Sequence, residues 1–412
     1  MPDTAYLIAF DDEAVEEEFY DDVVSLTVDE NTATGTSFRL QLATTLQDDG
    51  SWMYLEDARL ALFTRVSIQI GFSGGSGLTG ALGDSLGANG TGGNDGMEPV
   101  FDGYITDVEV VLGSEPDSAQ IEVSGLDSSV LMSLEEKIAT WTDLADSDIV
   151  KQIVGGVYGI TIQTEATLPV HRKNDTTIVQ RGSDLEFVRD LARRNGLEFY
   201  FETDKTSAAV IAYFRAPELD GTPQPDLAIQ FGDESNLRRF TVRLSGQRPL
   251  NVRTEQMDVR APDRPNRAQV GTMKLAALGE QDADALIGDR LRRLVRPIVA
   301  LAQVLVLGPP TSDPTELTTL AQAVRNEAGW LITAEGEING DAYQHALRPR
   351  RLVLVKGAGT AYSGKYYVTR VVHVLTGDGE YTQTFEARRN ARDLDGSEEF
   401  DADDLALPVP GA

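Results

Sequence analysis

Apolar and polar residues alternate with a two-residue period through much of the first 127 residues of this chain. Such alternation is typical of strands that bury one face and expose the other. It covers five segments, at residues 23–28, 37–42, 66–72, 100–111 and 119–124. A turn at 113–117 joins the last two segments as a predicted hairpin. We therefore predict that residues 1–127 form a first strand-rich domain.

A tract of Gly, Ser, Asn and Asp interrupts this pattern at residues 73–96. Few of its side chains are able to bury apolar surface, so we expect a loop that joins two strands. Two interpretations of the loop stay open. It becomes ordered against a neighbouring subunit, or it is a flexible insertion.

Helical periodicity begins near residue 128 and predicts helices at 128–138 and 146–159. The second helix places five apolar side chains on one face: Ile149, Val150, Ile153, Val154 and Val157. Together with the capped helix described next, these helices predict an α/β insert domain over residues 128–205.

A third helix has well-marked ends in the sequence. Ser183 and Glu186 have the spacing of a capping box, and Gly196 tolerates a left-handed C-terminal turn. An aromatic strand at 197–201 follows without a linker. The unit is well formed locally and contains no recognisable catalytic pattern.

Strand patterns return in the second half of the chain, at residues 210–214, 227–231, 240–244, 351–355, 364–375 and 381–387. A Pro-marked polar stretch at 260–267 predicts a boundary, and a helix is predicted at 281–295. Arginines gather at the end of that helix, where we expect a solvated or salt-bridged helix terminus, with partner contact as the alternative. We predict three regions: a strand-rich linker with a helix (206–300), a second strand-rich domain (301–390) and a poorly ordered acidic tail (391–412). The expected fold class is α+β, mostly β.

The net charge of −30 and the pI near 4.4 exclude surfaces that bind phosphate groups. Nucleic-acid affinity depends on clustered Lys and Arg, so we expect no nucleic-acid partner, and the same acidity repels anionic membranes. The chain has no cysteine, so neither disulfides nor thiolate metal sites are expected. No apolar run is long enough to span a membrane, and the N-terminus lacks a signal-peptide pattern.

Several motifs match catalytic patterns only by composition. Residues 71–75 and 83–87 both read G-x-S-x-G, and residues 75–80 read G-x-G-x-x-G, yet no predicted helix follows within the glycine tract. The histidines, His171, His345 and His373, lack metal-binding spacing, and we expect structural roles for them. The acidic residues from Asp393 to Glu399 have the wrong spacing for a calcium loop. We therefore assign no catalytic, cofactor-binding or metal-binding residue and expect no cofactor.

Four segments, in order, resemble the phage late control D and VgrG baseplate hub family. The capped helix and its strand, residues 180–201, resemble that family's Q-x-x-S-D-x-x-F pattern followed by an aromatic strand. Three further segments agree with it: 100–106 (VFDGYIT), 147–159 (SDIVKQI with Tyr-Gly) and 363–373 (SGKYYVTRVVH). The similarity spans about residues 20 to 390.

This resemblance implies a structural hub with two β-barrel-like domains in each subunit, one on either side of the insert. The expected assembly is a homotrimer whose duplicated barrels match a hexameric tail tube or tube initiator, while its threefold axis matches a trimeric spike. Other baseplate subunits are further expected partners. The resemblance also implies a location in a virion or tail-like particle assembled in the host cytoplasm, a spike on a separate polypeptide, and no enzymatic role. From the carboxylate excess we expect an acidic lumen.

Two alternatives stay open. One is a tail-associated, carboxylate-dependent hydrolase, or lysin, which would need a cleft with convergent carboxylates. The other is a secreted carbohydrate-binding or adhesive protein with exposed aromatic platforms. The surroundings of Trp52, Trp141 and Trp330 instead predict packing.

Overall fold

The computed structural model describes residues 4–72, 96–113, 118–173, 177–258, 261, 263–294, 303–306, 313–396 and 398 of the chain. The predicted loop at 73–96 lies outside the described residues except for Gly96. So do the G-x-S-x-G motif at 83–87, the G-x-G-x-x-G motif at 75–80 and the last three residues of the G-x-S-x-G motif at 71–75. Most of the acidic tail and part of the Pro-marked stretch lie outside them as well.

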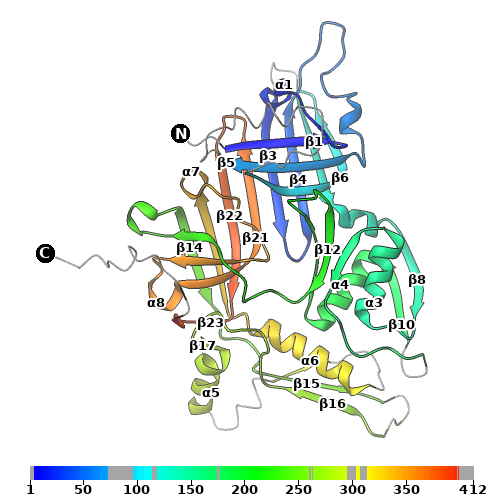
Figure 1. Cartoon of the computed structure of the whole chain (residues 1–412), viewed down its shortest axis with the longest axis vertical. Helices are drawn as coiled ribbons and strands as arrows, with labels where there is room; N and C mark the ends of the chain where they lie inside the picture. Colours follow the sequence, from blue (N-terminus) through cyan, green and yellow to red (C-terminus); the bar gives the residue numbers. More distant parts are fainter. Residues whose placement is uncertain are drawn as a thin grey trace, which may run out of the picture.

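One long sheet runs through the molecule and joins its two strand-rich regions (Figure 1). Its strands from the first region are β1 (Thr4–Phe10), β2 (Glu13–Ala14), β3 (Val23–Asn31), β4 (Gly35–Ala43), β5 (Arg65–Phe72), β6 (Met97–Val111) and β7 (Gln120–Asp127). Its strands from the second are β13 (Gln224–Ala228), β14 (Leu237–Leu244), β19 (Ile332–Asn339), β20 (Leu352–Lys356), β21 (Gly364–Thr376) and β22 (Tyr381–Arg389). The main path runs β14-β19-β22-β21-β3-β4-β7-β6-β5-β1-β2, and every neighbouring pair on it is antiparallel.

The sheet curls around two separate apolar cores because its longest strands change partners along their length. Strand β6 pairs with β5 through residues 97–104 and with β7 through 103–111. Strand β21 pairs with β20 near its start and with β3 near its end. The first core gathers residues from β1 and β3–β7, and the second gathers residues from β13, β14 and β19–β22.

The mostly-β, α+β fold class predicted from the sequence is confirmed. The two barrel-like regions form no closed barrel among the described strands; they are joined edge to edge through the ladder between β21 and β3. The β21–β3 ladder satisfies backbone N–H and C=O groups that would lie at exposed sheet edges if the two regions were separate barrels.

The insert has a third core and lies to one side of the sheet (Figure 1). Its elements are a 3-10 helix (Ser128–Ser133), β8 (Glu136–Trp141), α3 (Asp146–Lys151), a π-helical turn (Gln152–Val157), β9 (Thr161–Thr164), β10 (Ile178–Ser183), α4 (Asp184–Asn195), β11 (Glu198–Thr203) and β12 (Val210–Arg215). Helix α4 begins and ends as predicted: Ser183 and Glu186 make both capping-box hydrogen bonds, and Gly196 has φ of 70°.

Two predictions within the insert are wrong. Residues 128–138 do not form one helix: a short 3-10 helix ends at Ser133, and residues from Glu136 onward pair with β10. Hydrogen bonding to β10 stabilises residues 136–141 as a strand. The competing helical pattern is weak, because it starts with two serines, which are poor helix formers. Val157 is 61% exposed, because the wider π-helical turn moves it off the apolar face that buries Ile149 and Val154.

Below the long sheet in Figure 1 lies a group of short strands and helices. A small sheet contains β15 (Asn251–Gln256), β16 (Asn266–Val270) and β18 (Gln303–Val306), with α6 (Pro314–Ala328) against it. Other short elements are α1 (Glu17–Asp21), a 3-10 helix (Ala58–Leu60), a 3-10 helix (Gly232–Glu234), β17 (Gln281–Asp282), a π-helical turn (Asp284–Gly288), α5 (Asp289–Leu294), α7 (Gly340–Tyr343), α8 (Gly359–Tyr362) and β23 (Ala391–Arg392). The predicted helix at 281–295 is thus a π-helical turn followed by α5, in which Arg290 and Arg293 are exposed.

Candidate functional site

The face of the long sheet that points away from both cores is polar across the strands from β14 to β6. On β14, Phe240 and Val242 pack against the second core, so Arg239, Thr241 and Arg243 between them point outward. The same alternation holds on the neighbouring strands. Their outward residues include Glu335 and Glu337 on β19, Thr384 and Glu386 on β22, Arg370 and Val372 on β21, Thr27 and Asp29 on β3, Arg39 and Gln41 on β4, Glu122 and Ser124 on β7, and Asp107 and Glu109 on β6. We call this surface the polar face.

Strand pairing places these residues in rows that cross the sheet. One row joins Arg239, Glu337, Thr384, Val372 and Asp29 through successive cross-strand partners. The register is fixed by the buried side chains on the opposite face, because a slip of one residue would turn them into water. The polar face is therefore a direct consequence of the packing of both cores.

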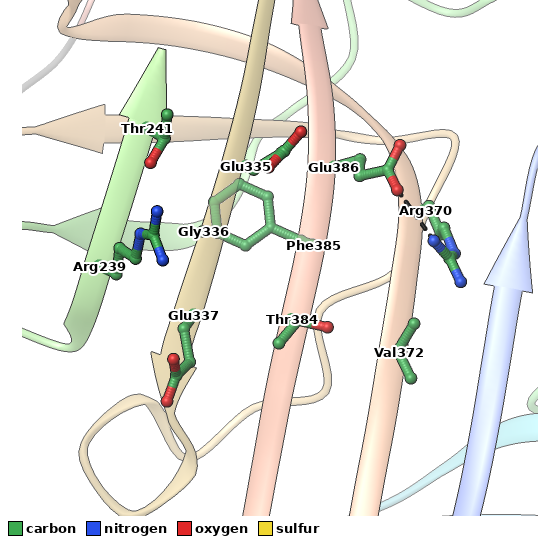
Figure 2. Close-up of a pocket in the computed structure, with 10 residues that line it drawn as sticks. All are labelled: Arg239, Thr241, Glu335, Gly336, Glu337, Arg370, Val372, Thr384, Phe385 and Glu386. Atoms are coloured by element: carbon green, nitrogen blue, oxygen red, sulfur yellow. Dashed lines mark hydrogen bonds and ion pairs between the residues drawn. The ribbon is translucent and has the colours of Figure 1, made fainter.

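A hollow of about 260 Å³ lies on this face between β14 and β21 (Figure 2). Arg239 and Thr241 line one side, Arg370 and Glu386 line the other, and Glu335 stands between them. The Phe385 ring and Gly336 form part of its floor. The hollow is open and carries charges of both signs, which suits contact with another macromolecule better than enclosure of a small apolar ligand.

Ion pairs balance part of the charge on this face. Arg370 bonds Asp29 at 2.7 Å and Glu386 at 2.9 Å, and these hydrogen bonds raise the pKa of the guanidinium above its ordinary value. Arg39 lies 3.3 Å from Glu122. Arg239, Arg243, Asp107 and Glu109 have no ion-pair partner among the described residues.

A buried polar cluster lies under the joint between the two strand-rich regions. Glu30 on β3 accepts from Arg348 at 2.8 Å and contacts the His373 imidazole on β21 at 3.1 Å. His373 in turn contacts the Tyr381 hydroxyl at 2.7 Å. Burial alone raises the pKa of Glu30, but Arg348 and His373 more than offset it, so the pKa lies below its ordinary value. The cluster connects the two strand-rich regions, and its Glu30 and Arg348 also line a small hollow of about 20 Å³.

A second buried cluster ties the insert to α6. Asp146 receives hydrogen bonds from His171 at 2.8 Å, from the Arg194 Nε at 2.7 Å and from Asn195 at 2.6 Å. Burial raises the pKa of Asp146, yet these donors lower it to about 2 overall. Arg194 also lies 3.7 Å from Glu316 on α6. The carboxylate is fully engaged, so the arrangement is structural.

The residues singled out in the sequence are dispersed in the fold. His171 and His373 lie in the two separate buried clusters. Near the C-terminus, Glu398 accepts from the backbone of Asp395 and Gly396. Within the described part of the chain, no group of three or more His, Cys, Asp and Glu residues is arranged to hold a metal ion. No described helix is long and apolar enough to cross a membrane.

Trp330 and Trp141 pack against aromatic side chains, whereas Trp52 is partly buried and its backbone bridges to Leu46. Trp330 is 3% exposed and stacks on Tyr367, with the Arg388 guanidinium above it. Trp141 stacks on Phe187 and bonds Gln180. The stacking of Trp330 and Trp141 matches the packing predicted for these two residues.

Sequence reasoning did not find the polar face. Its alternation was visible strand by strand, but the joining of distant strands into one surface depends on pairings such as β21 with β3, which no local pattern reveals. Arg239 and Arg243, which have no ion-pair partner among the described residues, also gave no signal, because isolated arginines in a strand are ordinary surface residues.

Comparisons with known proteins give one family and several structural relatives. A family model described as "Alg8 N-terminal domain" matches residues 90–377. A tail protein of 43 kDa from prophage MuSo2 of Shewanella oneidensis has a similar structure, with a TM-score of 0.60 and 13% identity over 95% of this chain and 100% of that one. A tail protein from Neisseria meningitidis has a TM-score of 0.58 and 11% identity, over 94% of this chain and 97% of that one.

A component of the type VI secretion system of E. coli is also similar. It is described as resembling the T4 bacteriophage tail proteins gp27 and gp5, and the TM-score is 0.52 with 15% identity, over 89% of this chain and 73% of that one. No curated protein matches this chain by sequence. At these identities the structural matches show that this chain shares its fold with these three proteins.

Proposed function

The chain belongs to the family described as "Alg8 N-terminal domain", and from its tail-protein fold we propose that it is a structural baseplate hub of a contractile phage tail or phage-tail-like injection system. The observation that carries this proposal is the extent of the match: the MuSo2 tail protein aligns over all of its length and 95% of this chain. A match of this extent includes both strand-rich regions and the insert, so it concerns the whole architecture.

The finer family assignment is part of the proposal. The matched family model is a different one from the late control D and VgrG family that four sequence landmarks resemble. The likeness to the type VI secretion component supports a hub of that kind. We also propose the domain division given above, except that β13 and β14 from the 206–300 stretch join residues 301–390 in the second of two equivalent units, since they share its core.

In this proposal three copies form a ring, and the two strand-rich regions of each copy present near-equivalent surfaces to a hexameric tube or tube initiator. A trimeric spike binds along the threefold axis, and other baseplate subunits bind the periphery. The partners include neither nucleic acid nor membrane. The assembly belongs to a virion or tail-like particle and forms in the host cytoplasm.

The polar face suits the lining of such a ring. Hydroxyl side chains such as Thr27 and Thr384 alternate with charges of both signs, so no large apolar patch or single-sign field holds passing cargo. The outward residues named above include four arginines and seven carboxylates, so this surface carries both signs of charge with an acidic excess. We propose a polar lumen with an acidic excess, as expected from composition.

We propose no enzymatic role. The carboxylates of the hollow, Glu335, Glu337 and Glu386, lie on an open sheet surface. A general acid needs a cleft that excludes water in order to stay protonated, and the hollow does not provide such a cleft. The alternative of a lysin makes a distinct prediction: the purified chain alone would clear a peptidoglycan suspension, and a Glu335→Gln, Glu386→Gln variant would not.

The direct test is the mass of the purified chain in solution, combined with electron microscopy. We expect a trimer seen as a ring, which binds the tube and spike proteins encoded beside it. A stable monomer that binds neither protein contradicts the hub proposal.

A further inference from the structure

A second hollow, also of about 260 Å³, is lined by the end of β14, the π-helical turn at 284–288, α5 and β23. Its aliphatic lining consists of Leu244, Leu286, Ile287 and Leu291, and two cations, Arg290 and Arg392, line it as well. We call this site the apolar hollow. We infer that residues 399–410 of the same chain bind in it, with their carboxylates at Arg290 and their leucines against the aliphatic side chains.

The described residues cover the aliphatic lining only in part. Leu286, Ile287 and Leu291 pack against the second core on one side. Leu244 lies two positions beyond Val242, on the side of β14 that faces this core, and is nevertheless 41% exposed. Apolar surface of this kind is stabilised when a further apolar segment removes it from water.

A positive charge lies beside this apolar surface. Arg290 is exposed and has no ion-pair partner among the described residues. Arg392 lies 3.1 Å from Asp393, so its charge is partly balanced. An occupant that fits both features of the apolar hollow combines a carboxylate with aliphatic side chains.

The sequence beyond Glu398 contains this combination within a few residues. Residues 399–404 read EFDADD and carry four carboxylates, whereas residues 405–410 read LALPVP and carry no charge. Because Asp404 and Leu405 are adjacent, one short segment supplies both an anion for Arg290 and aliphatic side chains for the hollow. The prolines at 408 and 410 favour an extended backbone, which reduces the entropy that binding costs.

The segment begins close enough to reach the apolar hollow within its own chain. Arg392 lies on β23, which pairs with β17 directly before the π-helical turn, and the three labels β23, β17 and α5 lie together in Figure 1. Glu398 follows Arg392 by only six positions. An extended chain spans about 3.6 Å per residue, so Glu398 lies within about 20 Å of Arg392. Residues 399–404 span this distance back, which gives the tethered segment a high effective concentration at the hollow.

This inference goes beyond the hub function and does not depend on it. Exposed apolar patches promote association with other proteins, and a segment of the same chain that covers the patch prevents it. The sequence left partner contact open for the arginines near the end of the predicted helix at 281–295. The inference assigns Arg290 a partner within its own chain.

The chain has no cysteine, so one introduced pair gives a clean test. Leu244→Cys and Leu407→Cys are combined in one full-length chain, and the dilute protein is oxidised. We expect a disulfide within the chain, seen as a shift in mobility on a non-reducing gel at the mass of one chain. A covalent dimer would assign the hollow to the tail of a second copy and would overturn the inference.

A matched control measures random encounters of the tethered segment. Thr360 is exposed on α8, and the neighbouring Ala361 carbonyl oxygen accepts a hydrogen bond from the Asp393 N–H. Thr360 therefore lies close to the start of the segment, but it does not line the apolar hollow. We expect the disulfide from Leu244→Cys to form at least about tenfold faster than one from Thr360→Cys, each with Leu407→Cys. Equal rates contradict binding in the hollow.

Two further substitutions in the Leu244→Cys, Leu407→Cys chain test the assigned contacts. Leu405→Asp should slow disulfide formation at least about tenfold, because the hollow loses an aliphatic side chain and gains a charge. Arg290→Glu should slow it at least about threefold, since the carboxylates of the segment then meet a like charge. The control is Arg293→Glu, which makes the same change on an exposed part of α5 outside the hollow and should have little effect.

Charge exchange completes the test. Asp403→Arg with Asp404→Arg should restore the rate that Arg290→Glu lowers, because the opposite charges then meet again. Circular dichroism of each variant checks that the fold is retained. A rate that responds to neither Arg290→Glu nor Leu405→Asp overturns the inference, because a different segment or another protein then fills the hollow.

Discussion

Arg348 and Glu30 form an ion pair of 2.8 Å in the protein interior, although 318 positions separate them in the chain. Arg348 also bonds the Pro99 carbonyl oxygen, and Glu30 contacts His373. The pair lies where the two strand-rich regions join through β3 and β21. It connects segments whose relative position sets the curvature of the polar face.

Removing one member of this pair should be costly. The Arg348→Ala variant leaves the Glu30 carboxylate buried without its main partner, so we expect a loss of about 3–5 kcal/mol in unfolding free energy. Chemical denaturation at neutral pH measures it. The matched control is Arg370→Ala, which breaks partly exposed pairs with Asp29 and Glu386 and should cost about 1 kcal/mol or less. Equal losses in the two variants would contradict a special role for the buried pair.

The cluster around Asp146 predicts a dependence of stability on acid. Its donors hold the pKa of Asp146 at about 2 in the folded protein, against an ordinary value of 3.8. Because the folded-state pKa is lowered, the stabilisation is complete above about pH 4 and is lost as pH falls toward 2. The shift corresponds to about 2 kcal/mol.

The Asp146→Asn variant tests this dependence. At neutral pH it should be less stable than the wild type, and the difference should shrink between about pH 4 and pH 2. Unfolding free energies measured across this range give the comparison. A difference that stays constant with pH would show that Asp146 acts through packing rather than charge.

The start of α4 depends on the Ser183 hydroxyl. It accepts a hydrogen bond from the Glu186 backbone at 3.2 Å, and no aliphatic side chain is able to replace this acceptor. We expect Ser183→Ala to lower the unfolding free energy by about 1 kcal/mol and Ser183→Thr, which keeps a hydroxyl, to cost less. Thermal unfolding of the two variants measures the ordering, and the reverse ordering would contradict the capping role.

Two glycines near the end of β20 should respond differently to alanine. Gly357 and Gly359 have φ of 81° and 70°, so both substitutions carry backbone strain of about 1–2 kcal/mol. A Cβ at Gly357 would also lie 1.9 Å from the Ile229 carbonyl oxygen, whereas one at Gly359 meets nothing within 4 Å. We expect Gly357→Ala to be the more destabilising by about 2 kcal/mol or more. Denaturant titration compares the unfolding free energies of the two variants. Equal losses would show that the Ile229 segment moves away to make room for the alanine methyl group.

Local signals predicted the elements that depend on local interactions. The helix from Asp184 to Asn195 is fixed by the Ser183 cap and by the left-handed Gly196, and both are readable in sequence. The alternating strands, such as β4 and β22, were predicted because a half-buried strand must alternate. The failure at residues 128–138 came where a strand partner, β10, lies some forty positions away.

Composition, the alternation of apolar residues and the capping signals determined by themselves that this chain is mostly β with an α/β insert, and that its motifs carry no recognisable catalytic chemistry. Only the tertiary structure decided which strands are neighbours. The pairing of β21 with β3 depends on packing between residues hundreds of positions apart, and sequence periodicity carries no information on such partners. That pairing makes one polar face out of two regions and leaves Arg239 and Glu109 at opposite edges, each without an ion-pair partner among the described residues.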